Sequence, residues 1–215
     1  YAQHAAGAAQ VRAARAASYD VTATITRKEA ERRVDAFARF NGQWAIALWD
    51  TRTQELVLCR DRVGVRPLFL HEGDGRVRFA SEVKALYADP DVSRALDPRG
   101  IEETFTFWGS RAPTSVFAGV EELPPGVVRR YSRSGAKVDQ TYWQPSYPRV
   151  QGDGPRDADS CTLDEAVTGL RDRLLNASEL RMLRADVPVG AYLSGGIDSS
   201  YVAWLARDAV RGKFH

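Results

Sequence analysis

Several chemically distinctive residue types are scarce in this chain. Its 215 residues include two cysteines, three histidines and one methionine. Cys59 and Cys161 belong to no C-x-x-C pair, which argues against a zinc site or a disulfide framework and fits a reducing compartment. His4, His71 and His215 lie far apart in the sequence. Chemistry that needs a histidine base or a histidine-bound metal therefore has no candidate cluster.

Long apolar runs and clustered charges are also lacking. The apolar run from Trp44 to Trp49 is far shorter than a membrane span, and no charged and then apolar leader opens the chain. The formal net charge is only +2, and the arginines are dispersed without an accompanying aromatic platform. We therefore expect a cytoplasmic protein with neither a membrane nor a nucleic acid among its partners.

Composition divides the chain into four parts. Apolar residues make up 44% of the sequence, which is enough for one large or two small domains. Residues 1–30 form an alanine-rich arm that we expect to be disordered. Prolines, glycines and aspartates without apolar periodicity mark residues 144–160 as a linker between residues 31–143 and residues 161–215. Because the chain begins with Tyr1 and stops where a further strand is expected, we interpret it as a fragment.

Residues 31–143 have the pattern of a layered α+β domain. Apolar spacing predicts a helix over residues 28–40, and alternating residues then predict two β-hairpins that form one antiparallel sheet. The strands are expected at residues 43–50, 55–60, 67–71 and 76–80. Two helices should follow at residues 81–87 and 97–105, the first with Ser81 as its N-cap. Helices after a meander are typical of a layered α+β domain.

Residues 161–215 follow a different pattern. Thr162 and Glu165 have the spacing of a capping box, and the helix after them carries an apolar stripe. A short apolar run at residues 187–193 predicts a buried strand of a parallel sheet. A second helix begins near Ser199. We therefore expect the first helix, strand, loop and helix of an α/β domain.

The turn between that strand and that helix holds the most informative motif. It reads Leu-Ser-Gly-Gly-Ile-Asp-Ser-Ser from Leu193 to Ser200. Two glycines permit positive φ, and N–H groups at the helix start can bind an anion together with the serine hydroxyls. Asp198 would repel a phosphate unless a hard cation such as Mg²⁺ bridges the two. The alternative is an ordinary turn in which Asp and Ser only cap the helix.

The motif resembles the pyrophosphate loop of the ATP pyrophosphatase group, whose enzymes adenylate a substrate and release pyrophosphate. It has no lysine after its glycines, so it is not a G-x-x-x-x-G-K-[ST] loop. The resemblance implies ATP and Mg²⁺ as cofactors, with Asp198 acting through the metal. The ATP-binding residues that it implies are Leu193, Ser194, Gly195, Gly196, Asp198, Ser199 and Ser200.

Four earlier segments resemble the glutamine-hydrolysing asparagine synthetase family, in matching order. They are Phe40 to Asp50, Cys59 to Leu68, Phe79 to Leu86, and Leu123 to Gly126. In that family a class II glutamine amidotransferase domain of the Ntn type precedes a parallel-sheet synthetase domain with the pyrophosphate loop. The resemblance implies that residues 31–143 are the C-terminal part of the first domain. Residues 161–215 would then begin the second.

The resemblance also implies an activity. It is the ATP-dependent amidation of aspartate through β-aspartyl-AMP, with release of AMP and pyrophosphate. The partners that it implies are small-molecule substrates, namely glutamine, aspartate and ATP. The sequence does not determine the oligomeric state, and a homo-oligomer is one possibility.

The glutaminase residues of the family have no counterpart here. Its N-terminal cysteine nucleophile is absent and no cysteine of this chain has that context, so we assign no catalytic residue and expect no glutaminase activity from the chain itself. Asn41-Gly42 precedes a predicted strand, and we assign it to turn geometry rather than to an oxyanion hole. Arg60-Asp61 and Arg66-Pro67 predict a tight turn that is held by charge pairs and serves as scaffold.

Two alternatives stay open at this point. One is a related amidotransferase or β-lactam-forming synthetase that uses the same two domains with a different acceptor. The other is a truncated, non-catalytic remnant whose sheet serves only for interactions. The residues of this chain do not identify the acceptor.

Overall fold

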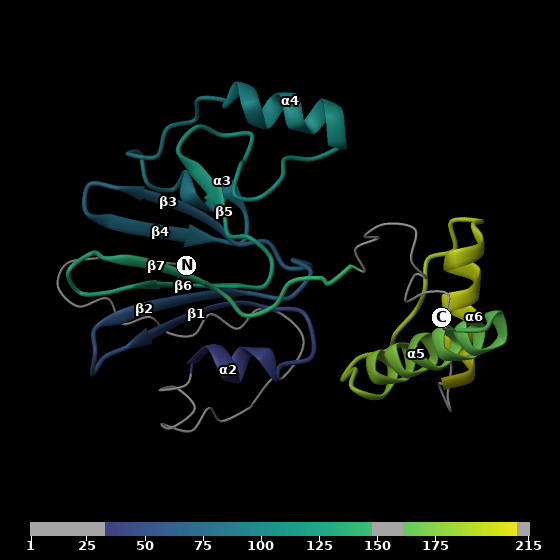
Figure 1. Cartoon of the computed structure of the whole chain (residues 1–215). Helices are drawn as coiled ribbons and strands as arrows, with labels where there is room; N and C mark the ends of the chain where they lie inside the picture. Colours follow the sequence, from purple (N-terminus) through teal and green to yellow (C-terminus); the bar gives the residue numbers. More distant parts are fainter. Residues whose placement is uncertain (1–32, 148–160, 210–215) are drawn as a thin grey trace, which may run out of the picture. The chain divides into compact units, whose positions relative to one another are not determined.

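The computed structural model describes residues 33–147 and 161–209, and the chain divides into two compact units, Tyr1–Pro145 and Ser146–His215 (Figure 1). Sheets and short helices form the first unit, and a pair of longer helices forms the second. The predicted arm at residues 1–30 and most of the predicted linker lie outside the described residues.

Two antiparallel sheets form the centre of the first unit. The larger sheet has the strand order β1-β2-β6-β7, and the smaller has the order β4-β3-β5. The strands are β1 Ala45–Asp50, β2 Glu55–Arg60, β3 Phe69–Gly73, β4 Arg76–Ala80, β5 Val120–Glu122, β6 Val127–Tyr131 and β7 Lys137–Thr141. The helices are α2 Arg33–Ala38, α3 Val83–Leu86 and α4 Pro98–Phe107.

Both predicted hairpins are confirmed, but the expectation that they share one sheet is wrong. β1 pairs with β2 in the larger sheet, whereas β3 pairs with β4 in the smaller one. The chain leaves the larger sheet after Arg60, and β6 takes the other edge of β2. Sequence reasoning missed β5, β6 and β7 because they are short and rich in charged residues, which hides the alternation typical of a strand.

Alternate residues of β2 face two different cores. Leu58 belongs to a cluster that also contains Leu70 and fills the space between the sheets. Val57 faces the other way and shares a cluster with Phe37 of α2. On the far side of the smaller sheet, Leu86 of α3 forms part of a third cluster. The order of layers is helix, sheet, sheet, helix, which confirms the predicted layered α+β domain with antiparallel strands (Figure 1).

The helix starts in this unit were predicted with mixed success. Asp97 caps α4, because its carboxylate accepts a hydrogen bond from the Arg99 N–H at 2.9 Å. The prediction that Ser81 caps α3 is wrong. Glu82 is the N-cap, and it has extended backbone angles and no capping hydrogen bond from its side chain. Ser81 directly follows β4, and the chain stays extended for one residue more before the helix begins.

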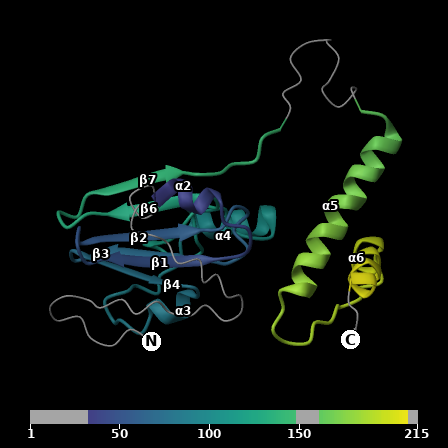
Figure 2. The ribbon, with the colours of Figure 1, turned by 90° about the horizontal axis from the view of Figure 1, so that it is seen from below.

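The second unit consists of α5 (Leu163–Leu183) and α6 (Ile197–Ala209), which lie side by side (Figure 2). The predicted capping box is confirmed: the Thr162 hydroxyl accepts from the Glu165 N–H, and the Glu165 carboxylate accepts from the Thr162 N–H at 2.9 Å. Leu205 and Ala206 of α6 are buried. Among the described residues, no helix has the length and apolar character that crossing a bilayer requires.

The strand predicted at residues 187–193 is not formed. These residues have no regular secondary structure, and Val187 and Leu193 are exposed. A parallel strand needs neighbouring strands to bond its backbone, and the described residues of this unit contain no strand. The order found is therefore helix, irregular segment, loop and helix. The parallel sheet of the predicted α/β domain is absent from the described residues.

Candidate functional site

The predicted phosphate loop lies at the start of α6, as its sequence indicates. Gly195 has φ +83°, a left-handed conformation that favours glycine, and the chain enters the helix at Ile197. The first N–H groups of a helix have no partner within it, so they point toward the space that an anion would occupy. Gly195 therefore serves the turn geometry for which the motif was singled out, whereas Gly196 does not adopt a positive φ.

Ser199 closes this loop with its side chain. Its Oγ lies 3.3 Å from the Ser194 N–H, from which it accepts, and 3.0 Å from the Ser194 Oγ. It also donates to the Gly196 carbonyl at 3.1 Å, and the Ser200 hydroxyl donates to the same carbonyl at 2.9 Å. The hydroxyl of Ser199 thus connects the helix start to Ser194, near the beginning of the predicted site.

Most of the predicted ATP-binding residues lie on the surface. Ser199 is half-buried, and the exposed ones are Leu193, Ser194, Gly195, Gly196, Asp198 and Ser200. Leu193 is 66% exposed, so it presents an apolar side chain beside the loop. A ligand can reach every member of the set from solvent.

Asp198 is the carboxylate of this loop, in the first turn of α6. The described residues contain no group of three or more His, Cys, Asp or Glu side chains that could hold a metal ion. Mg²⁺ is commonly bound by one or two carboxylates together with the phosphates of a substrate. Asp198 together with the phosphates of a nucleotide would form a donor set of this kind.

In the first unit, the predicted turn after β2 is present, but Asp61 holds it differently from the prediction. Asp61 is fully buried, and its carboxylate accepts hydrogen bonds from four backbone N–H groups. The donors are Trp44, Val63, Val65 and Arg66, at 2.9 to 3.3 Å. Charge pairing within the turn was the expectation. Backbone donors replace it because the turn itself presents N–H groups to the carboxylate.

Arg60 joins this turn to a distant segment. Its guanidinium donates to the carbonyls of Gly64 and Leu123, each at 2.8 Å, and pairs with the Glu122 carboxylate at 2.8 Å. Sequence reasoning missed Glu122, because a partner so far along the chain leaves no signal in a local pattern. The contacts support the scaffold role that was expected of the segment.

The two cysteines have opposite surroundings. Cys59 is buried, its Sγ accepts from the Trp44 indole N–H at 3.4 Å, and burial raises the pKa of its thiol to about 12. Cys161 is exposed beside the start of α5. A nucleophilic cysteine needs a lowered pKa, and the surroundings of Cys59 raise it instead.

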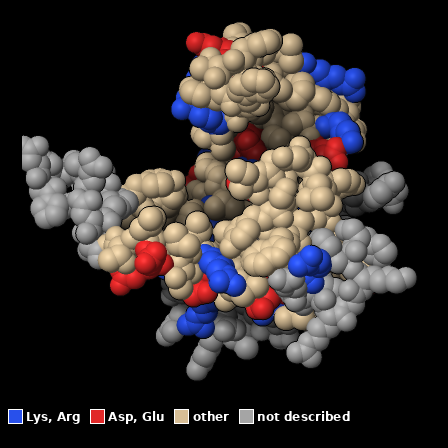
Figure 3. Space-filling view, turned by 90° about the vertical axis from the view of Figure 1, so that its right-hand side faces the viewer, with Lys and Arg blue, Asp and Glu red and all other residues tan. Residues whose placement is uncertain are grey.

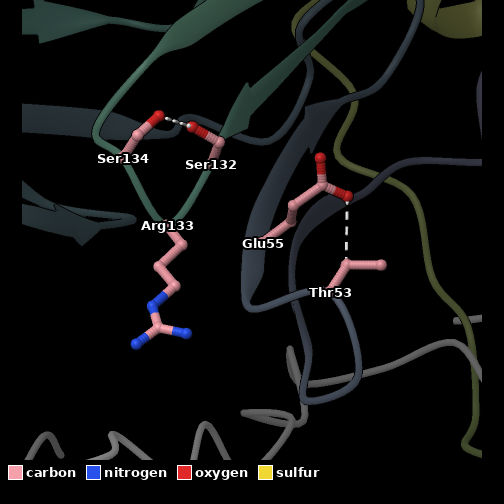
Figure 4. Close-up of a pocket in the computed structure, with 5 residues that line it drawn as sticks. All are labelled: Thr53, Glu55, Ser132, Arg133 and Ser134. Carbon is pink, nitrogen blue, oxygen red and sulfur yellow. Dashed lines mark hydrogen bonds between the residues drawn. The ribbon is translucent and has the colours of Figure 1, made fainter.

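A shallow pocket of about 570 Å³ lies where the β1–β2 and β6–β7 turns meet (Figure 4). It is lined by Thr53, Glu55, Ser132, Arg133 and Ser134. Hydrogen bonds join Thr53 to Glu55 and Ser132 to Ser134. None of the predicted site residues lines this pocket.

Charged side chains of both signs are interspersed on the face shown in Figure 3. Arg78 pairs with Asp89 at 2.6 Å, and Arg111 pairs with Glu103 at 3.2 Å. Such pairs neutralise charge locally.

Comparison with known families fits this division of the chain. The glutamine amidotransferase domain family matches residues 11–143, and the asparagine synthase family matches residues 169–215. The chain belongs to the glutamine-hydrolysing asparagine synthetase family. The amidotransferase match starts at residue 11, within the segment predicted to be an arm.

Individual relatives of this family cover most of the chain. The glutamine-hydrolysing asparagine synthetase 3 of Bacillus subtilis is 34% identical over 80% of the chain, and the amidase chyE of Penicillium rubens is 34% identical over 81%. The chain spans only about a quarter of these relatives, 26% and 24% of their lengths. A solved glutamine PRPP amidotransferase from B. subtilis, with ADP and GMP bound, aligns over 83% of the chain at 13% identity and a TM-score of 0.35.

Proposed function

We propose that the protein carrying this chain is an asparagine synthetase that uses glutamine as its nitrogen donor. It would activate aspartate with ATP to β-aspartyl-AMP, release pyrophosphate, and complete the amidation with release of AMP. The amidotransferase family of the first unit supports the nitrogen donor. The asparagine synthase family that matches residues 169–215 supports the acceptor and the nucleotide.

The observation that carries this proposal is the loop from Ser194 to Ser200 at the start of α6. It combines a left-handed glycine, N–H groups at a helix start, clustered hydroxyls and one acidic side chain. An ordinary helix cap requires only one of these features. Their combination, within the segment that the asparagine synthase family matches, favours the nucleotide-site interpretation over a simple cap.

Each group of the loop has a distinct role in this proposal. The backbone N–H groups of Gly195 and Gly196 would bind phosphate oxygens, and the hydroxyls of Ser194 and Ser200 would donate to them. Ser199 would keep the loop closed through its bonds across it. Because negative charge spreads over phosphate oxygens during adenylation, fixed donors at these positions stabilise the transition state without reorganising.

Asp198 would hold Mg²⁺ together with the phosphates. When bound, the metal supplies neutralisation of phosphate charge and orients the leaving pyrophosphate. Near a bare phosphate, a carboxylate would weaken binding. ATP is therefore expected to bind far more weakly after chelation of Mg²⁺ with EDTA.

The test is aspartate-dependent exchange of labelled pyrophosphate into ATP by the protein that carries this chain. Exchange reports adenylation without requiring glutamine, so it isolates the step assigned to the loop. Exchange that requires aspartate and Mg²⁺ is the expected result. Exchange that is absent with aspartate and present with another acid would reject aspartate as acceptor and keep the adenylating loop.

A related enzyme with another acceptor is the second candidate. It is favoured by similarity to chyE, which is named an amidase and is as identical to this chain as the Bacillus synthetase is. A panel of carboxylic acids in the same exchange assay separates the two candidates.

A further inference from the structure

A group of charged residues joins the two sheets of the first unit along β7, the outermost strand of the larger sheet (Figure 2). At its centre is Arg129 of β6, whose side chain is only 5% exposed. Its guanidinium donates to both oxygens of Asp139 on β7, at 2.7 and 2.8 Å. A planar guanidinium suits this two-pronged contact, which lysine cannot reproduce.

Two carboxylates reach the same group from the smaller sheet. Glu121 of β5 accepts from Arg129 at 2.7 Å. Glu72 of β3 accepts from the Tyr131 hydroxyl at 2.6 Å, from Lys137 at 3.0 Å and from Arg129 at 3.4 Å. The Arg129 cluster consists of Glu72, Glu121, Arg129, Tyr131, Lys137 and Asp139, and it connects two strands of each sheet.

β7 has little else to fix it against the smaller sheet. Every residue of this strand is exposed, so it contributes no buried apolar side chain to the core. It pairs with β6 through the backbone from Val127 to Tyr131. The cluster connects β7 to the smaller sheet in two ways. Lys137 bonds Glu72 directly, and Asp139 bonds Arg129, which in turn bonds the carboxylates of the smaller sheet.

The strand also determines how the chain leaves this unit. Directly after β7, the Tyr142 hydroxyl donates to the Arg60 carbonyl at 2.8 Å, and the N–H groups of Tyr142 and Trp143 donate to the Gly126 carbonyl. Gly126 is in turn bonded to the Asp61 carbonyl through its own N–H. The cluster and the Asp61 turn therefore hold the two ends of one strand.

We propose that the Arg129 cluster is an acid-sensitive latch that holds β7 on the smaller sheet and so fixes the exit of the chain from the first unit. Arg129 is buried, whereas Glu72, Lys137 and Asp139 are exposed. An ionic group buried in this way can specify one arrangement of the elements that it joins without adding much stability. The latch is closed while Glu72 is ionised. It opens when the charge of Glu72 is lost.

The direction of the pH dependence follows from Glu72. Partial burial acts to raise the pKa of this carboxyl, but hydrogen bonds from Tyr131 and Lys137 outweigh it and hold the pKa below its ordinary value. Arg129 also donates to it, through the same nitrogen that donates to Glu121, and the residue opposite Glu72 on β4 is the uncharged Val77. A lowered pKa means that Glu72 stabilises the fold above the ordinary glutamate pKa of about 4.3, and that this is lost as the pH falls through the folded value.

Hydrogen exchange of the full chain, read by mass spectrometry at matched pH, tests the latch. In Glu72→Gln, amides of β3 and β7 should exchange about three- to tenfold faster at pH 7, while β1 and β2 keep their protection. The unaltered chain should lose protection in β3 and β7 as the pH falls through the folded pKa of Glu72, and this loss should be weaker in the variant. Glu102→Gln, an exposed position on α4, is the matched control and should change neither.

Milder variants keep the test decisive if Glu72→Gln unfolds the whole unit. Tyr131→Phe removes one hydrogen bond to Glu72, and Glu121→Gln removes one contact to Arg129. Each variant should raise amide exchange in β7 more than in β1. Tyr131→Phe should also raise exchange in β3, and Glu121→Gln should also raise it in β5. Unchanged protection of β7 in both variants, or an acid response equal to that of the unaltered chain in each, overturns the proposal.

Discussion

At the scale of single residues, Asp61 explains how a full charge can be placed in the core. Four backbone N–H groups surround its carboxylate, so the hydrogen bonds lost from water are replaced. The neighbouring residue, Arg60, is also buried and carries the opposite charge to Glu122. The local sequence predicted the turn from Arg60-Asp61 and Arg66-Pro67, which flank Gly64. It could not predict the partners, which depend on where distant segments fold.

Replacing Asp61 with Asn should therefore destabilise the first unit strongly. Asn offers one acceptor oxygen in place of two and turns an N–H₂ group toward N–H donors, which leaves buried polar groups unpaired. We expect a loss of about 2–4 kcal/mol in the free energy of unfolding, measured with urea. Asp74→Asn, an exposed position in the β3–β4 turn, is the control and should change it little. Equal effects at the two positions would contradict the assigned role of Asp61.

The cysteines give a second prediction at this scale. Burial raises the pKa of Cys59 to about 12, so its thiol stays protonated and shielded at pH 8, whereas Cys161 is exposed. A thiol reagent should modify one cysteine of the native chain quickly and the other only in denaturant. Cys161→Ser should remove the fast reaction. A fast reaction that persists in this variant would show that Cys59 is accessible.

At the scale of elements, the sequence correctly predicted features that depend on neighbouring residues. Its predictions were wrong where the structure depends on strand pairing between distant segments. The hairpins, the start of α4 near residue 97 and the Thr162 capping box are local features, and all are confirmed. The allocation of hairpins to two sheets depends on β6, which joins β2 from far along the chain. The run at residues 187–193 is apolar enough for a strand, but the described part of its unit offers no partner for its backbone.

Two glycines that lie within helices, Gly100 and Gly169, allow a test of whether close packing or helix propensity determines the effect of a substitution by alanine. Alanine is the better helix former by about 1 kcal/mol at an exposed position. At Gly100 of α4 an added Cβ would collide with the Ser115 backbone, whereas at Gly169 of α5 it would meet only the flexible Arg173 guanidinium. Gly100→Ala should therefore destabilise its unit by about 1–3 kcal/mol.

Gly169→Ala should have the opposite sign and stabilise α5 by about 0.5–1 kcal/mol. Hydrogen exchange resolved by peptide measures each helix separately, so the two effects can be read in the same experiment. A stabilised α4 in Gly100→Ala would mean that α4 does not approach Ser115 as closely as described.

At the scale of the whole molecule, the chain carries an amidotransferase-family scaffold and a candidate nucleotide loop, and the sequence predicted the first more fully than the second. The order of family-like segments predicted the family, which the matches at residues 11–143 and 169–215 confirm. The loop residues were proposed from motif chemistry, and the structure supplies their geometry: a left-handed Gly195 and a half-buried Ser199 that bonds across the loop. Ligand binding stays a prediction.

Asp198→Ala tests that prediction in the protein that carries this chain. Without the carboxylate, Mg²⁺ loses its protein ligand while the N–H donors of the loop remain. Aspartate-dependent exchange of pyrophosphate into ATP should then fall by about a hundredfold or more, because charge stabilisation in the transition state is lost. Asp198→Glu should recover part of it at higher Mg²⁺ concentration. Asp172→Ala, an exposed acidic position on α5, is the control for charge and should leave exchange unchanged. Full exchange in Asp198→Ala, with unchanged dependence on Mg²⁺, would reject the metal role of this residue and leave the loop as a site built from backbone and hydroxyl donors alone.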